Sequence, residues 1–324
     1  MTAYSARPML DPALSHAMHQ RNHRRLWRIA IFAGLYLIAE GGAVFVYSAL
    51  GGVWWAMIVA LPLYVLAGAS LHGISLFTHE GTHGVLSHHD TLNRWIAMVC
   101  AYPVLQTFAA YQVLHLRHHK YLGAIGDPDH YPNYTTWSPL IWAMHWGRLV
   151  LGYPAYITAI PVLGFLQGSG RDRLWILFEL ALLGALIATV LASPIPGYFL
   201  IHGWLVPMLI INFMVNIRGM SQHTLLEHET DMVLGSRTLL TGRLVRFFMC
   251  NENFHLEHHL YPGVPWYNLP RLHQSLRDEL QGRGAPYVSS YSAFVRDFMR
   301  ASIHRRAMGT VSLRGLGTHS SGKT

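Results

Sequence analysis

The chain has 324 residues, of which 52% are hydrophobic and only 12% are charged, a composition too apolar for ordinary soluble domains and indicative of a membrane protein. Its formal net charge of +8 does not require a nucleic-acid partner, because basic residues flank the long apolar stretches, where they can meet anionic lipid headgroups. The two cysteines, Cys100 and Cys250, are too few for a disulfide framework or a thiolate metal cluster, so we expect each to be a small buried hydrophobic residue.

The polar N-terminal segment, residues 1–26, lacks the basic, apolar and cleavable pattern of a removable signal peptide. We therefore expect the apolar stretch that follows it to remain in the mature chain. A single membrane domain is predicted over residues 27–273, followed by a cytosolic segment over residues 274–324. The small, polar, glycine-rich tail after Arg306 is predicted to be disordered.

Four apolar stretches are long enough to cross a hydrocarbon core of about 30 Å, which takes about 20 helical residues. These predicted spans lie at 27–50, 53–77, 174–192 and 197–217. Very short, uncharged turns join the first span to the second and the third to the fourth. The sequence therefore predicts two transmembrane hairpins.

Basic residues gather at the ends of the spans that lie away from these two turns. By the positive-inside bias, these ends and both termini are predicted to be cytoplasmic, in a bacterial inner membrane or in the endoplasmic reticulum. The basic residues are Arg21, Arg24, Arg25, Arg28, Arg94, Arg117, Lys120, Arg171, Arg173, Arg218, Arg237, Arg243 and Arg246.

Two less regular apolar segments, residues 95–111 and 137–166, lie between the hairpins. The first is short, and Pro139, Pro154 and Pro161 interrupt the second, so both are predicted to be helices that lie along the membrane interface. A fifth and a sixth span remain an alternative. The predicted fold class is thus an all-α integral membrane protein with four transmembrane helices in two hairpins, interfacial helices and a cytosolic histidine-rich cap.

Three short histidine clusters stand just beyond apolar stretches. On a helix, positions i, i+3 and i+4 share a face, so each cluster points its imidazoles in one direction. Neutral imidazole is a ligand for iron, copper and zinc, and eight imidazoles exceed what one tetrahedral zinc ion can use. The pattern therefore predicts a site for two metal ions. The clusters are His79 with His83, His115 with His118 and His119, and His255 with His258 and His259.

In combination, these clusters resemble the histidine boxes of the integral-membrane fatty acid desaturase and hydroxylase superfamily, whose relatives include carotenoid ketolases and alkane hydroxylases. The resemblance runs from about Leu71 to about His273 and includes the stretch from Asn253 to Pro262 around the third box. It implies a non-haem di-iron centre, held almost wholly by histidines, that uses O2 and two electrons to attack an unactivated C–H bond. It also implies that the boxes face the cytosol.

Such centres take one further ligand from a histidine between the second and third boxes, and His223 and His228 are the candidates here. His223 is preferred because it follows the fourth span by about two helical turns, and because its spacing from Arg218 resembles the pattern of the family. An alternative interpretation of His228 is a solvated surface residue between two glutamates. The resemblance thus implies nine iron ligands: His79, His83, His115, His118, His119, His223, His255, His258 and His259.

Three further residues are candidates for supporting roles around the metals. His72 lies seven residues before His79 inside the second span; it could support the site, pair with Glu40 of the first span, or bond to a neighbouring helix without a function. Asp127 and Asp129 follow the second cluster closely. Their carboxylates could orient imidazole N–H groups, or they could simply form a turn with the proline between them.

Two other functions compete with an oxidase. Residues 79–83 match the H-E-x-x-H signature of zinc metalloproteases, in which Glu80 would be the general base, but that hypothesis leaves two clusters unexplained and supplies no third ligand. A metal carrier or a haem-binding subunit is the other alternative. Ligands of those proteins commonly lie within the spans, whereas these clusters lie at or beyond the span ends.

The resemblance favours desaturation of a fatty acyl chain in a lipid. His255 stands where front-end desaturases have Gln, and the three-residue gap in the first box is similar to that of acyl-lipid desaturases, hydroxylases and ketolases. Hydroxylation or ketolation of a carotenoid, an alkane or another hydrophobic substrate is the second choice. The sequence holds no Cys cluster and no H-P-G-G haem motif, so we expect electrons from a separate donor of the ferredoxin or cytochrome b5 type.

Overall fold

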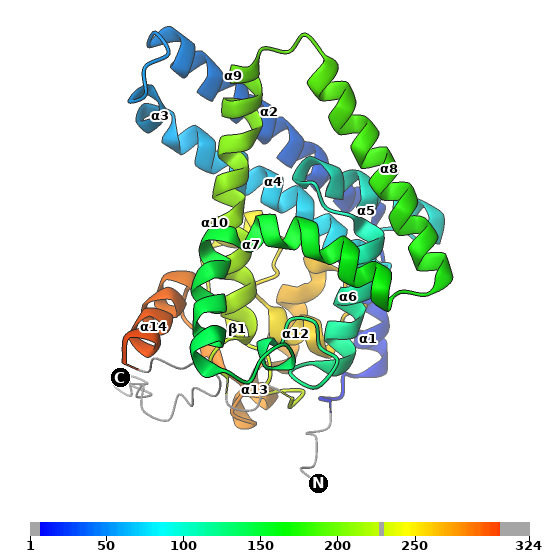
Figure 1. Ribbon diagram of the computed structural model, residues 1–324. Helices are drawn as coiled ribbons and strands as arrows, with labels where there is room; N and C mark the ends of the chain where they lie inside the picture. Colours follow the sequence, from blue (N-terminus) through cyan, green and yellow to red (C-terminus); the bar gives the residue numbers. More distant parts are fainter. Residues whose placement is uncertain (1–6, 227–229, 305–324) are drawn as a thin grey trace.

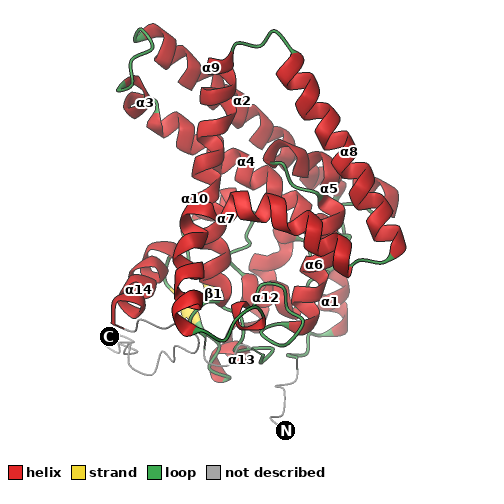
Figure 2. Ribbon diagram, viewed as in Figure 1, coloured by secondary structure: helices red, strands yellow, loops and turns green. Residues whose placement is uncertain are grey.

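The computed structural model describes residues 7–226 and 230–304, and within these residues the chain is almost entirely helical (Figures 1 and 2). The strands among them are the two-residue β1 (Thr238–Leu239) and β2 (Tyr287–Val288), which pair in parallel. The predicted all-α class is therefore confirmed. Cys100 and Cys250 are both buried with free thiols, as expected. The tail after Arg306 lies outside the described residues.

Five helical segments are long and apolar enough to cross a membrane, so the predicted count of four spans is not confirmed. The helical segments Asp90–Val104 and Phe108–Tyr121 meet at a bend of 102°, and together they are also long and apolar enough to cross a membrane if they are taken as one span. The segments are His23–Ala49, Leu61–Thr82, Ser138–Gln167, Gly170–Ala192 and Gly197–His223. They contain η1 (His23–Leu26), α2 (Trp27–Ala49), α4 (Leu61–Thr82), α7 (Ser138–Gln167), α8 (Gly170–Ala192), α9 (Gly197–Leu200), the π-helical turn η4 (Ile201–Leu205) and α10 (Val206–His223).

The helices of the structure do not share the bounds of the second predicted span, 53–77. Residues 56–59 form the separate short helix α3 (Ala56–Val59), and α4 starts only at Leu61, with Pro62 in its first turn, where a missing N–H costs nothing. At its other end α4 continues to Thr82, and α10 likewise continues to His223. Both membrane helices therefore carry their histidines on their own last turns.

The segment at 137–166 is helical, as predicted. Pro154 and Pro161 do not interrupt it, because residues 138–167 form one helix, α7, which contacts α6 (Phe108–Tyr121), α8 and α10. Neighbouring helices allow a membrane helix to keep internal prolines. Figure 1 shows α7 passing across the middle of the molecule, with both ends in the lower half of the view. Its interfacial position stays a prediction.

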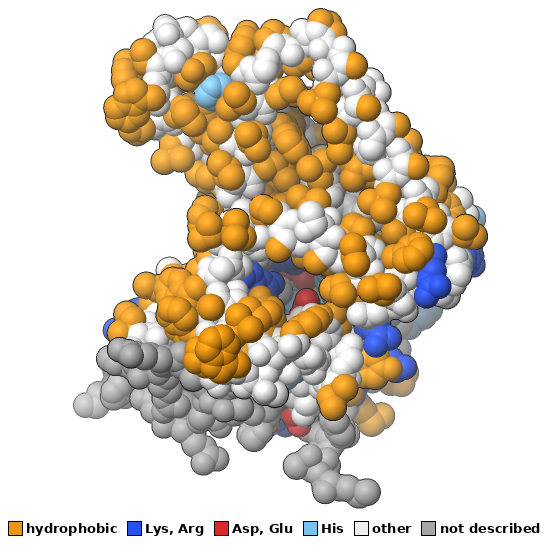
Figure 3. All heavy atoms as spheres, viewed as in Figure 1, with side chains coloured by type: hydrophobic (Ala, Val, Ile, Leu, Met, Phe, Trp, Pro, Cys, Tyr) orange, Lys and Arg blue, Asp and Glu red, His pale blue; other side chains and the backbone are white. Residues whose placement is uncertain are grey.

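Most of the remaining elements form a cap below the spans in Figure 1, at the end where both termini lie and opposite the turns that follow α2 and α8. A cluster of buried apolar residues, including Met18, Leu256 and Leu276, joins the helices of the cap. Figure 3 shows hydrophobic side chains spread over the upper, span-bearing part. The elements of the cap are α1 (Pro12–Met18), η3 (Tyr131–Asn133), α11 (Arg243–Phe248), α12 (His255–Leu260), η5 (Trp266–Asn268), α13 (Leu269–Gly282) and α14 (Tyr291–His304), whereas α5 (Asp90–Ala101) and η2 (Tyr102–Val104) pack against α4.

Close contact between α4 and α10 depends on Gly68. A Cβ atom at this position would lie 2.8 Å from the Cβ of Ile210 and 3.1 Å from the carbonyl oxygen of Pro207. Small residues allow membrane helices to approach closely in this way. Because α4 and α10 both carry candidate ligands, this contact fixes the distance between them.

We predict that Gly68→Ala destabilises the protein by about 1–3 kcal/mol, because the added methyl group has no room between the two helices. Gly34→Ala is the matched control: Gly34 also lies inside a span, on α2, but a Cβ there meets nothing within 4 Å. Thermal unfolding of the detergent-solubilised variants measures the difference. Equal midpoints for the two variants would contradict the prediction.

Candidate metal centre

The structure brings all nine candidate histidines together in two groups. In each group, one ring nitrogen from every member lies within 4.8 Å of those of the others. The first group draws on α4, α6 and α12, and the second on α6, α10 and α12. The first group is His79, His83, His115, His119 and His258, and the second group is His118, His223, His255 and His259.

The end of α4 sets the positions of His79 and His83. His79 is in the last turn and His83 is the C-cap residue. Gly84 follows with a φ of +70°, and its N–H bonds to the carbonyl of Gly81 at 3.1 Å. A glycine in the left-handed conformation is a common helix terminator, because it has no Cβ to oppose that conformation. The helix thus stops where its two histidines face the other clusters.

His118 on α6 is oriented from behind by Asp127. Its Nδ1–H donates to Asp127 Oδ1 at 2.9 Å, and Asp127 also accepts the backbone N–H groups of Gly123 and Asp129. Burial by itself raises the pKa of Asp127, but these hydrogen bonds outweigh it and hold the pKa below its ordinary value. The Asp129 side chain is 62% exposed, and its carboxylate lies 3.8 Å from the same nitrogen. Of the two predicted aspartates, Asp127 makes the close contact.

The short helix α12 carries the third cluster on one face and Glu257 on another. The Glu257 carboxylate is fully buried and accepts hydrogen bonds from Thr238 Oγ1 and His273 Nδ1. These bonds tie α12 to β1 and α13. A helix of six residues is too short to be stable alone, so its orientation depends on such anchors. Neither Glu257 nor His273 was predicted from the sequence to have this role.

In the first group, the Nε2 atoms face one another at short distances. His115 Nε2 lies 3.0 Å from both His83 Nε2 and His119 Nε2, and His119 Nε2 lies 3.2 Å from His258 Nε2. Adjacent ligands at about 2.0–2.1 Å from one ion are separated from each other by about 3.0–3.4 Å. The spacing in this group therefore fits ligands of a shared metal ion.

In the second group, the ring nitrogens are arranged so that a cation between them would be favourable. His223 donates Nδ1–H to the carbonyl of Gly235 at 3.0 Å, as His118 does to Asp127, so neither neutral ring carries a proton on Nε2. These two bare Nε2 atoms nevertheless lie 3.3 Å apart, and His223 Nε2 is also 3.0 Å from His255 Nε2. Lone pairs that converge in this way repel one another unless a cation lies between them.

Burial keeps the imidazoles of α12 in the neutral form that binds metals. It lowers the pKa of His255, His258 and His259 well below the ordinary value, and positive charge on neighbouring histidines lowers it further. Metal ligands must be deprotonated, so these residues need no proton loss when a metal binds at neutral pH.

Glu80, the second residue of the first box, lies behind His79. Its Oε2 accepts the backbone N–H of Trp266 at 2.9 Å, and its Oε1 lies 3.8 Å from His79 Nδ1. The general base of a zinc metalloprotease must instead face the water on the metal. The geometry therefore does not fit the protease alternative.

Glu252, which the sequence analysis missed, also lies behind the histidines. Its side chain is fully buried, and burial raises the pKa of its carboxyl to about 7, although Arg218 opposes that shift. The available signal was its place three residues before His255, directly before the stretch that carries the family resemblance.

The structure does not support the suggested pairing of His72 with Glu40. His72 is buried in α4, and neither of its ring nitrogens has a hydrogen-bond partner among the described residues. His228 lies outside the described residues, so the structure places only His223 with the other ligands.

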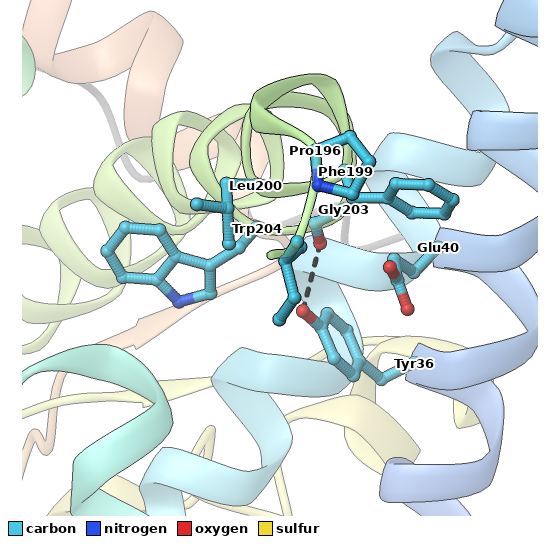
Figure 4. Close-up of a pocket in the computed structure, with 8 residues that line it drawn as sticks. Tyr36, Glu40, Pro196, Phe199, Leu200, Gly203 and Trp204 are labelled. Atoms are coloured by element: carbon cyan, nitrogen blue, oxygen red, sulfur yellow. Dashed lines mark hydrogen bonds between the residues drawn. The ribbon is translucent and has the colours of Figure 1, made fainter. Parts of the chain in front are cut away.

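Glu40 lines a pocket of about 420 Å³ between α2 and the α9–η4 segment (Figure 4). Tyr36 donates its hydroxyl hydrogen to the carbonyl of Gly203 at 2.9 Å on one wall, and apolar side chains form most of the rest. Figure 1 places α9 near the top of the molecule and α12 near the bottom. This pocket is therefore separate from the histidine groups.

Comparison with known proteins agrees with the site. Residues 52–291 match the fatty acid desaturase family, and the chain belongs to that family and is an oxidoreductase. It is 24% identical over 309 residues to the sn-1 oleoyl-lipid 12-desaturase of Picosynechococcus sp., covering 84% of this chain and 82% of that protein. It is also 24% identical over 304 residues to the mouse (Mus musculus) sphingolipid delta(4)-desaturase DES1, covering 86% and 81%.

A third relative, from Homo sapiens, is named for two reactions. The chain is 26% identical over 227 residues to the sphingolipid delta(4)-desaturase/C4-monooxygenase DES2, covering 64% of this chain and 62% of that protein. The name of this relative thus joins a desaturase activity to a monooxygenase activity.

We predict that His83→Ala and His259→Ala each remove one of two bound metal ions, because each variant takes one ligand from one group only. Each loss should leave the other group able to bind, so metal content should fall from about two ions per chain towards one. Elemental analysis of purified protein measures this. Loss of all metal from both single variants would contradict two separable positions.

Proposed function

We propose that the protein is a membrane-bound, O2-dependent di-iron oxidase, and that its reaction is the desaturation of a fatty acyl chain in a lipid. One observation carries the proposal: nine histidines of a desaturase-family chain converge in groups of five and four, and within each group one ring nitrogen of every member lies within 4.8 Å of those of the others. Nine nitrogen donors exceed the four that a single zinc ion takes.

The donor set fits iron. Imidazole is a suitable ligand for iron, and the described residues around the site add carboxylates only on the far side of the imidazoles, as Asp127 and Glu252 do. When bound, two irons supply the activation of O2 with two electrons from a donor. The overall reaction is R–CH2–CH2–R plus O2, two electrons and two protons, giving R–CH=CH–R and two water molecules.

Residues of the chain orient the candidate ligands and keep water away from the proposed reaction site. Asp127 and the carbonyl of Gly235 fix the rings of His118 and His223, so that both present Nε2 to the same point. The last turns of α4 and α10 place histidines beside the ends of apolar helices, where a lipid chain can reach them while water is excluded. Position along that chain decides which carbon is oxidised, and a shift of about 1 Å can change a rate about a hundredfold.

A separate electron donor of the ferredoxin or cytochrome b5 type completes the proposal. Arg24 and Arg25 of η1 are exposed at the capped end of the molecule, where an acidic donor could dock. By the positive-inside bias, this end and the metal centre are cytoplasmic.

Hydroxylation is the second candidate, because the printed name of DES2 includes a monooxygenase activity beside a desaturase activity. That reaction takes R–CH2–R, O2, two electrons and two protons to R–CHOH–R and one water molecule. Oxidation of a carotenoid or an alkane would belong to this candidate.

We predict that expression in a host with a defined lipid pool produces a lipid lighter by two hydrogens. His258→Ala, which removes a ligand of the first group, should abolish the product. Mass spectrometry of total lipids distinguishes the reactions, since a gain of one oxygen would support the hydroxylase instead. An unchanged lipid profile in a host that also supplies a suitable electron donor would contradict both.

We also predict that Glu80→Gln keeps its metal and loses no more than about tenfold in activity, because the amide oxygen can still accept the Trp266 N–H. In a zinc protease the same change would remove the general base and abolish activity. Metal content and lipid product are measured on the same preparation. A variant that binds metal fully but is inactive would favour a base role for Glu80.

A further inference from the structure

Glu252 sits in a tightly fixed turn between α11 and α12. Its N–H bonds to the carbonyl of Met249 at 2.8 Å, and the two residues before it, Cys250 and Asn251, have φ values of +45° and +57°. This conformation is unfavourable for residues other than glycine and persists where surrounding contacts impose it. One such contact is the hydrogen bond from Asn251 Nδ2 to the carbonyl of Trp266 at 3.0 Å.

The carboxylate of Glu252 reaches one histidine of each group. Its Oε1 lies 3.4 Å from His79 Nδ1 in the first group, and its Oε2 lies 3.4 Å from His255 Nδ1 in the second. Arg218 Nη1, from α10, approaches Oε2 at 3.9 Å. The single side chain of Glu252 therefore lies next to one Nδ1 atom of each group, and the positive charge of Arg218 partly balances the negative charge of its carboxylate.

These four atoms have no other hydrogen-bond partner. Both oxygens of Glu252, and the Nδ1 atoms of His79 and His255, are buried and unpaired among the described residues. Buried polar atoms are rarely left unpaired in this way. A small approach of a few tenths of an ångström would turn both 3.4 Å separations into hydrogen bonds from imidazole N–H to carboxylate.

We infer that Glu252 is a positioning residue shared by both metal positions, a role that rests on the two-metal function proposed above. Its two oxygens hold His79 and His255 with Nδ1–H towards the carboxylate and Nε2 towards the metals. Such partners fix the tautomer and orientation of a ligand and raise its basicity. Because one rigid carboxylate supports both groups, its loss weakens both metal positions.

Asp127 provides the matched control. It is also a buried carboxylate behind a candidate ligand, but it contacts His118 of the second group. Removal of its charge should therefore weaken one position, whereas removal of the Glu252 charge should weaken two.

The experiment compares the full-length wild type with the Glu252 and Asp127 variants. Each protein is purified in detergent, stripped of metal with a chelator and titrated with Co²⁺. Affinities of the two positions are read from visible absorption and from elemental analysis, and thermal unfolding is followed with and without Co²⁺. We expect Glu252→Ala to weaken both positions by about 10- to 100-fold, and Asp127→Ala to weaken one by a similar factor. Glu252→Gln should lose less than Glu252→Ala, because one amide oxygen can still accept from one imidazole.

The unfolding midpoint separates positioning from a general structural role. The Glu252 oxygens are unpaired without metal, so the midpoint of metal-free Glu252→Ala should match the wild type, while its gain on adding Co²⁺ shrinks. If Glu252→Ala lowers the metal-free midpoint, the same two readings are taken on Glu252→Gln, which keeps the shape of the side chain.

Wild-type affinities at both positions in Glu252→Ala, or weakening of one position alone in that variant, would overturn the inference. A wild-type protein that binds fewer than two Co²⁺ ions is a different result, because it contradicts the proposed two-metal function itself.

Discussion

The mutual approach of nine imidazoles is the constraint on which the rest of the structure depends. Ring nitrogens of each group lie within 4.8 Å of one another, and in the second group the neutral rings of His118 and His223 bring two lone pairs to 3.3 Å from each other. Such an arrangement is unfavourable without a cation, so other interactions must hold it. The buried anchors behind the rings provide this hold: Asp127 for His118, the Gly235 carbonyl for His223, and Glu257 for the whole of α12.

Two membrane helices, α4 and α10, are long enough to carry candidate ligands on their own last turns. α4 and α10 each continue beyond their predicted ends, to Thr82 and His223, so that ligands stand on rigid helices and not on loops. Gly68 lets these two helices approach closely. The positions of the two histidine groups thus depend on helix packing, and the proposed reaction needs such precision because one carbon of a uniform chain must be selected.

Carboxylates surround the centre without entering it. Glu80 faces the backbone of Trp266, Asp127 faces His118, and Glu252 lies between the Nδ1 atoms of His79 and His255. This arrangement differs from di-iron sites in soluble four-helix bundles, where glutamates coordinate the metals directly. Negative charge set back from the metals can still balance their positive charge and raise the basicity of the imidazoles.

The sequence by itself determined the all-helical class, the apolar helices and the histidines that converge, because helical periodicity and span length are local properties. It did not show how far α4 and α10 continue beyond the predicted spans, or that residues 138–167 form one helix through Pro154 and Pro161, because packing by neighbouring helices decides both. Only the tertiary structure divided the histidines into two groups, mixing clusters so that His115 and His118 of one helix belong to different groups. It also showed that Glu252 and Glu257 lie behind the rings. The sequence could not show this, because contacts between residues distant in sequence leave no periodic signal.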